Sequence, residues 1–137
     1  MKIPCLLLLL VALVCRAHAQ SGGPDLDFAF SQFKGNGPIP FARVLYDTDP
    51  DNARLVVNQL SPLLAQSGDF FGYEIVSRKF LTKRIERVIA VIYFDRFPLY
   101  MRIDYYDTPK GRICLPASFT KDATAILPFE MISTTGK

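Results

Sequence analysis

The residues from Val88 to Tyr106, VIAVIYFDRFPLYMRIDYY, decide the fold of this 137-residue chain. The first half is almost entirely β-branched and aromatic, which is typical of a central strand that is covered on both faces. The second half alternates between apolar and polar residues, as a strand with one exposed face does. Pro98 lacks a backbone N–H and fits the start of a strand, so residues 95–98 are predicted to form the turn. The stretch therefore predicts an antiparallel hairpin.

The second strand of this hairpin divides its side chains between two faces. The apolar face, which we expect to join the core, consists of Leu99, Met101, Ile103 and Tyr105. The opposite face is polar but aromatic and consists of Tyr100, Arg102, Asp104 and Tyr106. Arg102 and Asp104 are two residues apart on this face, so we expect each to form a surface ion pair with the other or with a cross-strand partner.

The first nineteen residues have the parts of a secretory signal peptide. Lys2 gives a basic start, residues 6–14 are apolar, and residues 17–19 (Ala-His-Ala) form a small-x-small site, so cleavage is expected after Ala19. The apolar stretch is shorter than the roughly 20 residues of a membrane span. Cys15 follows a valine and not the small residue that precedes a lipid-modified cysteine. The leader predicts a periplasmic or secreted protein without a membrane anchor.

Residues 20–137 are predicted to form one domain. These 118 residues are enough for a core that buries roughly two thirds of the unfolded surface. Lys2 and Arg16 lie in the leader, and without them the count of basic residues falls from 16 to 14 against 13 acids. The resulting net charge of about +1 gives no global electrostatic reason to bind nucleic acid.

The predicted cleavage also removes the only histidine and two of the three cysteines. A chain without histidine cannot form a Ser-His-Asp or Cys-His pair, and zinc and copper sites lose their usual ligands. Cys114 then has no cysteine to pair with and lies between Ile113 and Leu115, which predicts a small buried hydrophobe. A reactive thiol or an intermolecular disulfide is the alternative for Cys114. We expect no metal and no cofactor.

The remaining chain is predicted to form helices first and strands later. Residues 25–34 have the spacing of a short amphipathic helix that ends at Gly35, followed by a loop to residue 40 and a further helical turn or two. Asp49 and Pro50 are a strong helix start, and Pro62 predicts a break or kink of that helix near Ser61. Further strands are expected at residues 73–81 and 112–119, with a last short apolar element at residues 126–132.

This order of elements predicts an α+β fold, with N-terminal helices packed on a curved, mainly antiparallel sheet. Residues 69–122 resemble the small secreted bacterial proteins of the nuclear transport factor 2-like superfamily, which have a cystatin-like α+β cone. The resemblance rests on Gly-Tyr-Glu at 72–74, Tyr-Phe-Asp at 93–95, the run over 97–106 and the Lys-Gly turn at 110–111. It implies a sheet that curls around a cone-shaped pocket.

In that superfamily, some members use the pocket for isomerase, cyclase or dehydratase chemistry, and many are not catalytic. No catalytic motif stands out here, so we expect a non-catalytic module that binds a small apolar ligand or a protein partner through the cone pocket or a sheet face. The candidate binding residues are Tyr93, Tyr100, Arg102 and Tyr106.

Two other functions stay open. One is a cofactor-free isomerase, cyclase or dehydratase in which Asp95 or Asp104 has a raised pKa and acts as the base. The other is a structural homodimer that is joined by its sheet faces. The candidate residues also fit purely structural roles, because tyrosines commonly supply packing area and Arg102 can pair with Asp104. A ligand pocket would require a cavity of roughly 300 Å³ or more.

Overall fold

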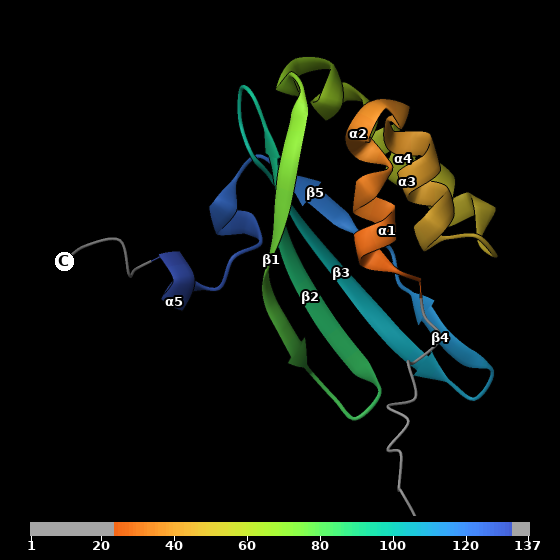
Figure 1. The fold of residues 1–137 in the computed structure, drawn as a ribbon. Helices are drawn as coiled ribbons and strands as arrows, with labels where there is room; N and C mark the ends of the chain where they lie inside the picture. The colour runs from red at the N-terminus through yellow and green to blue at the C-terminus, as the bar shows by residue number, and fades with distance from the viewer. Residues whose placement is uncertain (1–23, 133–137) are drawn as a thin grey trace, which may run out of the picture.

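A five-stranded antiparallel sheet forms one layer of the structure, and helices from the N-terminal half cover one of its faces (Figure 1). The computed structural model describes residues 24–132. The predicted signal peptide and its cleavage site after Ala19 lie outside the described residues. The arrangement of helices and strands confirms the predicted α+β fold class.

The first three helices are short: α1 spans Leu26–Ser31, α2 spans Phe33–Asn36 and α3 spans Pro38–Leu45. The single helix predicted over residues 25–34 is thus divided in two. Gly35 has a φ of 99°, a left-handed conformation that favours glycine, which agrees with the predicted helix stop. The loop predicted up to residue 40 is shorter than expected, because α3 already begins at Pro38.

Helix α4 runs without interruption over Pro50–Ser67. Asp49 caps it as predicted, and its Oδ1 accepts a hydrogen bond of 3.1 Å from an N–H of the first turn. Of the break or kink predicted near Ser61, the break does not occur. Pro62 removes the donor that the carbonyl of Asn58 would use, but both residues are exposed, so water can satisfy that carbonyl and the helix continues.

The strands are β1 (Phe70–Phe80), β2 (Ile85–Phe94), β3 (Leu99–Thr108), β4 (Gly111–Cys114) and β5 (Ser118–Thr120). They run in the order β1-β2-β3-β4, and β5 also pairs with β3. Strands β2 and β3 confirm the predicted hairpin, with Val91 opposite Tyr100 and Ile89 opposite Arg102. Residues 88–92 are all buried, as expected for a central strand.

The single strand predicted over residues 112–119 is wrong, because β4 and β5 are separate. Between them Pro116 has no N–H for a strand ladder. The Tyr46 hydroxyl donates a hydrogen bond to the Leu115 carbonyl (2.8 Å) and accepts one from the Ala117 N–H (2.9 Å). These two bonds fix the connection, so that β4 pairs with the end of β3 and β5 with its beginning.

The core lies between the helices and the face of the sheet that is turned toward them. Strand residues at alternate positions supply one side of it: Val88, Ala90, Ile92, Leu99, Met101 and Ile103 are fully buried there. Aromatic rings supply much of the other side, and Phe30 stacks on Tyr73 with ring centroids 4.2 Å apart. This side of the sheet is called the inner face below, and the opposite side is called the outer face.

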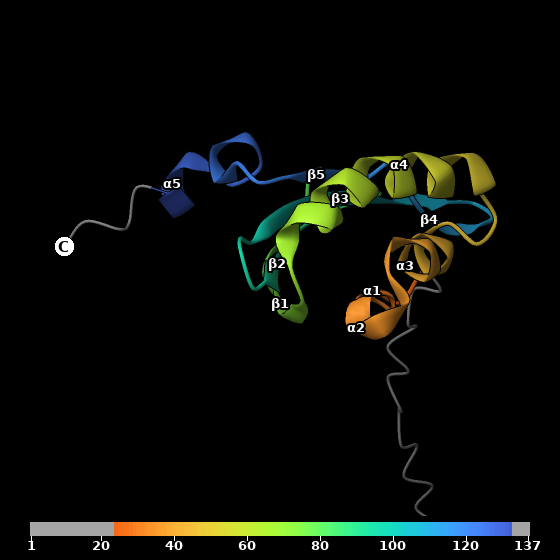
Figure 2. The same ribbon diagram turned by 90° about the horizontal axis from the view of Figure 1, so that it is seen from above.

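The C-terminal segment forms a 3-10 turn (η1, Ala123–Ala125) and a short helix, α5 (Phe129–Ile132). In both views of the fold it projects from the sheet on the side opposite α1, α2 and α3 (Figure 2). The predicted last element therefore exists as a helix, but Phe129 is 78% exposed and does not pack in the core.

Candidate functional site

The outer face of the sheet brings together most of the residues that were predicted to bind a partner or to act as a base. Because side chains alternate along a strand, the residues between the core positions of β2 and β3 point away from the helices. Tyr93, Tyr100, Arg102 and Tyr106, the four predicted binding residues, all occupy such positions. Asp104 lies on the same face, in line with the three from β3.

Asp95 lies apart from this group. It is exposed in the turn between β2 and β3, where its carboxylate accepts a hydrogen bond of 3.2 Å from the N–H of Asp69. The side chain also lies 3.0 Å from the position of a Cβ built on Gly68, so it packs against the end of α4. The two candidate carboxylates, Asp95 and Asp104, are therefore not in one site.

Two of the outer-face polar pairs are complete within the chain. Arg87 donates two hydrogen bonds of 2.8 Å to the two carboxylate oxygens of Asp104, and these bonds raise the pKa of Arg87. Tyr93 donates a hydrogen bond of 3.0 Å to Glu74, which raises the tyrosine pKa, and its ring stacks on Phe71. Asp104 thus has the predicted cross-strand partner.

Three other outer-face side chains have no such partner. Within residues 24–132, the side chains of Tyr100, Arg102 and Tyr106 make no hydrogen bond or ion pair, although all three are half-buried. The ion pair expected for Arg102 is therefore absent from the described part of the chain. Ile89 and Val91, their neighbours on β2, are only 4% and 8% exposed although they face away from the core. The centre of the outer face is thus an apolar floor beside tyrosines and an unpaired arginine.

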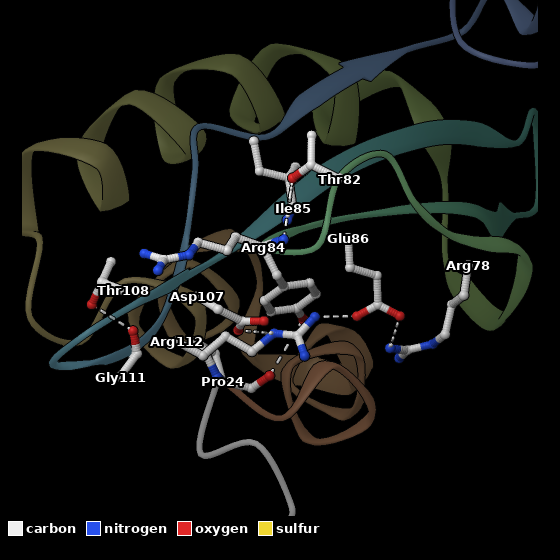
Figure 3. A network of polar contacts seen from close by, with 11 residues as sticks. Pro24, Arg78, Thr82, Arg84, Ile85, Glu86, Asp107, Thr108, Gly111 and Arg112 are labelled. Carbon is white, nitrogen blue, oxygen red and sulfur yellow. Dashed lines mark hydrogen bonds and ion pairs between the residues drawn. The ribbon is translucent and has the colours of Figure 1, made fainter.

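A second group of polar side chains lies on the inner face, at the edge of the core (Figure 3). Buried Glu86 pairs with Arg112 and lies 3.7 Å from Arg78. Arg112 lies 3.7 Å from Asp107 and places its guanidinium over the ring of Tyr105, 4.7 Å from the centroid. The sequence analysis missed this cluster, although Glu86 occupies the same alternate positions as Val88 and Ala90 on β2.

Burial determines the protonation of the neighbouring groups. It raises the pKa of Cys114 to about 12 and that of Tyr105 above its ordinary value, so both are neutral at physiological pH. The Tyr105 hydroxyl lies 3.3 Å from the carbonyl of Pro24. Cys114 is 6% exposed, in agreement with the predicted small buried hydrophobe. We therefore interpret the inner cluster as structural.

The space inside the curved sheet is filled by side chains. Phe30, Phe41, Leu60 and Met101 are fully buried there. Two of the grooves formed by residues 24–132 lie outside this space: one of about 560 Å³ lies between the α3–α4 loop and the β3–β4 hairpin, and one of about 570 Å³ lies between α3 and α4. No predicted binding residue lines either groove.

Two findings concern metals and membranes. Among residues 24–132, no three or more His, Cys, Asp or Glu side chains come together in a way that could hold a metal ion. Within the same part of the chain, no helix combines the length and the apolar character that a membrane crossing requires. Comparisons of the chain with protein-family models, with curated proteins and with solved structures found no match.

Proposed function

We propose that this protein is a non-catalytic module that is exported from the cell and binds a protein partner through the outer face of its sheet. The observation that carries the proposal is the half-buried Arg102, which has no ion pair in the described chain and stands beside the buried Ile89. The leader sequence is the basis for export.

The physical chemistry of the outer face supports a protein as the partner. A guanidinium that is partly removed from water is stabilised by a carboxylate or carbonyl partner. Without such a partner, a charge in partly desolvated surroundings is unfavourable. Tyrosine and arginine are, with tryptophan, the residues most enriched among those that dominate binding energy at protein interfaces. A row of these side chains over an apolar floor fits another protein surface better than it fits a small apolar molecule.

The alternatives lack comparable support. A carboxylic acid that works as a base needs apolar surroundings to raise its pKa. Asp104 instead accepts two hydrogen bonds from Arg87, and Asp95 is exposed in a turn. A small apolar ligand in the cone would have to displace fully buried core side chains such as Phe41 and Met101.

Site-specific photo-crosslinking tests the proposal. A benzophenone amino acid replaces Tyr100 or Tyr106 in the full chain, which is expressed with its leader in a bacterium. A matched variant carries the group at Leu55, which is 53% exposed on α4. We expect a protein adduct from positions 100 and 106 and none from position 55. Absence of an adduct at both sheet positions, or equal adducts at all three, would contradict the proposal.

A further inference from the structure

We propose that the turn between β1 and β2 binds the anionic surface of a lipid bilayer, which is a contact separate from the protein contact on the outer face. Residues 78–84 read Arg-Lys-Phe-Leu-Thr-Lys-Arg, and all seven are exposed. They are called the basic tip below. Phe80 is 58% exposed and Leu81 is 46% exposed, and neither belongs to the core. Two large apolar side chains thus stand in water within a run of cations.

The turn that carries the basic tip is fixed by hydrogen bonds. The Thr82 hydroxyl oxygen accepts bonds of 3.1 Å from the N–H groups of Arg84 and Ile85 (Figure 3). The Leu81 N–H donates to the Ile85 carbonyl, and the Asp107 N–H of β3 donates to the Arg84 carbonyl, each at 2.8 Å. The tip therefore presents its apolar side chains from an ordered turn, which reduces the entropy that binding would cost.

The cations of the basic tip can meet an outside partner. Within residues 24–132, the side chains of Lys79, Lys83 and Arg84 make no ion pair. Two acids of the adjoining strand ends, Glu86 and Asp107, are both paired with an arginine inside the fold. The basic tip thus concentrates positive charge in a chain whose overall charge is nearly balanced.

The neighbouring turn belongs to the same end of the molecule. Figure 1 shows that the β1–β2 turn and the β3–β4 turn both lie at one end of the sheet, opposite the β2–β3 turn. Lys110 is exposed in the β3–β4 turn and adds a further cation there. A bilayer at this end contacts the tips of the hairpins, so the outer face remains accessible to a protein partner.

An anionic bilayer fits this combination of side chains better than other anionic partners do. Proteins that bind at a membrane surface bury apolar side chains at the boundary of headgroups and acyl chains, while cations attract anionic lipids. Phe80 and Leu81 supply the apolar part of such a contact, and the three unpaired cations supply the charge. Nucleic acid would bind the cations through its phosphates and would leave the Leu81 side chain in water.

Sedimentation with lipid vesicles tests the inference. The full chain is expressed with its leader, purified and mixed with vesicles of phosphatidylcholine, either alone or with an equal part of phosphatidylglycerol. We expect binding to the anionic vesicles to be at least about tenfold stronger than to the neutral ones. Added salt should weaken it, because salt screens the charges. Equal binding to both kinds of vesicle, or binding to neither, would overturn the inference.

Two matched pairs of variants assign the binding to the basic tip. Phe80→Ser should weaken it by about tenfold, whereas Phe28→Ser, at a position on α1 that is 55% exposed, should leave it unchanged. Lys83→Glu should also weaken it by about tenfold or more. Lys34→Glu makes the same reversal on α2, where Lys34 lines a groove with Phe94 at the far end of β2, and should change binding by less than about twofold. Equal losses within either pair would overturn the inference.

A fluorescence measurement reports insertion directly. The sequence contains no tryptophan, so Phe80→Trp introduces a single reporter. Its emission should shift to shorter wavelength when anionic vesicles are added, and that of Phe28→Trp should not. Binding without a shift at position 80 would mean that the cations hold an anionic surface without insertion, and it would overturn the bilayer contact. The crosslinks from positions 100 and 106 do not involve the basic tip, so the proposed function and this inference fail independently.

Discussion

Tyr46 connects the end of α3 to the link between β4 and β5. Its hydroxyl bonds the Leu115 carbonyl and the Ala117 N–H, and Ala117 is 2% exposed. Tyr46→Phe would leave that buried N–H without a partner. We expect the free energy of unfolding to fall by about 1–3 kcal/mol, the cost of an unsatisfied buried polar group, in urea denaturation followed by circular dichroism.

Tyr100→Phe is the matched control, because it removes the same atom from a tyrosine whose hydroxyl has no hydrogen bond within residues 24–132. Its effect on the unfolding of the monomer should stay within about 0.5 kcal/mol. Equal losses in Tyr46→Phe and Tyr100→Phe would mean that the two hydrogen bonds of Tyr46 contribute no stability.

At the scale of elements, α4 contains an internal proline that lowers the stability of the helix. Pro62 is exposed inside the helix and leaves one carbonyl without its helical partner. Pro62→Ala should restore that hydrogen bond and raise the free energy of unfolding. A proline inside a helix costs about 3 kcal/mol, and part of this is offset because proline also restricts the unfolded chain. We expect a net gain of about 1–2 kcal/mol.

The control for this change is Gln59→Ala, which replaces another exposed residue of α4 with a good helix former. Urea denaturation of the two variants should separate the proline effect from the general benefit of alanine, which is below about 0.7 kcal/mol. A Pro62→Ala variant that is less stable than wild type would mean that the helix depends on a local distortion at this position.

Several elements that local patterns determine were predicted correctly, whereas features that depend on distant residues were not. The hairpin of β2 and β3 and the start of α4 follow from neighbouring residues alone. The division between β4 and β5 depends on Tyr46, which is 71 residues from Ala117 in sequence. The continuity of α4 at Pro62 depends on which side of the helix meets solvent, and that is set by packing.

The same distinction applies to the candidate site. Alternation along β3 predicts that Tyr100, Arg102 and Tyr106 share a face. It does not predict whether the helices cover that face, because their position follows from the whole core. Nor does it place Asp95, which lies in the turn where alternation ends. The inner pair of Glu86 and Arg112 was missed because its residues belong to different strands that are joined only through β3.

At the scale of the whole molecule, the two faces of one hairpin have separate roles. The inner face of β2 and β3 supplies the core, and the outer face supplies the proposed contact with a protein partner. Substitutions on the outer face should therefore change association with little effect on the folding of the monomer. This separation makes Arg102→Asp informative, because the same residue is not needed for the core.

The whole fold should also lose stability in alkali. Tyr46, Tyr105 and Cys114 are buried, and burial raises the pKa of Cys114 from 9.0 to about 12 and those of both tyrosines above 10.0. The folded chain holds these protons more tightly than the unfolded chain does. Stability is therefore complete below the unfolded pKa of about 9 and falls as the pH rises above it, by up to about 1.4 kcal/mol per pH unit for each group.

Urea denaturation at a series of pH values measures this loss, with Cys114→Ala as the informative variant. Without the thiol, the remaining groups whose pKa values are raised are tyrosines, with Tyr46 and Tyr105 among them, so the decline should begin near pH 10, about one unit later than in the wild type. Tyr106→Phe removes a tyrosine from the outer face and should leave the onset unchanged. If the wild-type free energy of unfolding stays constant up to about pH 11, these three groups titrate alike in the folded and unfolded chains, and their burial does not link folding to pH.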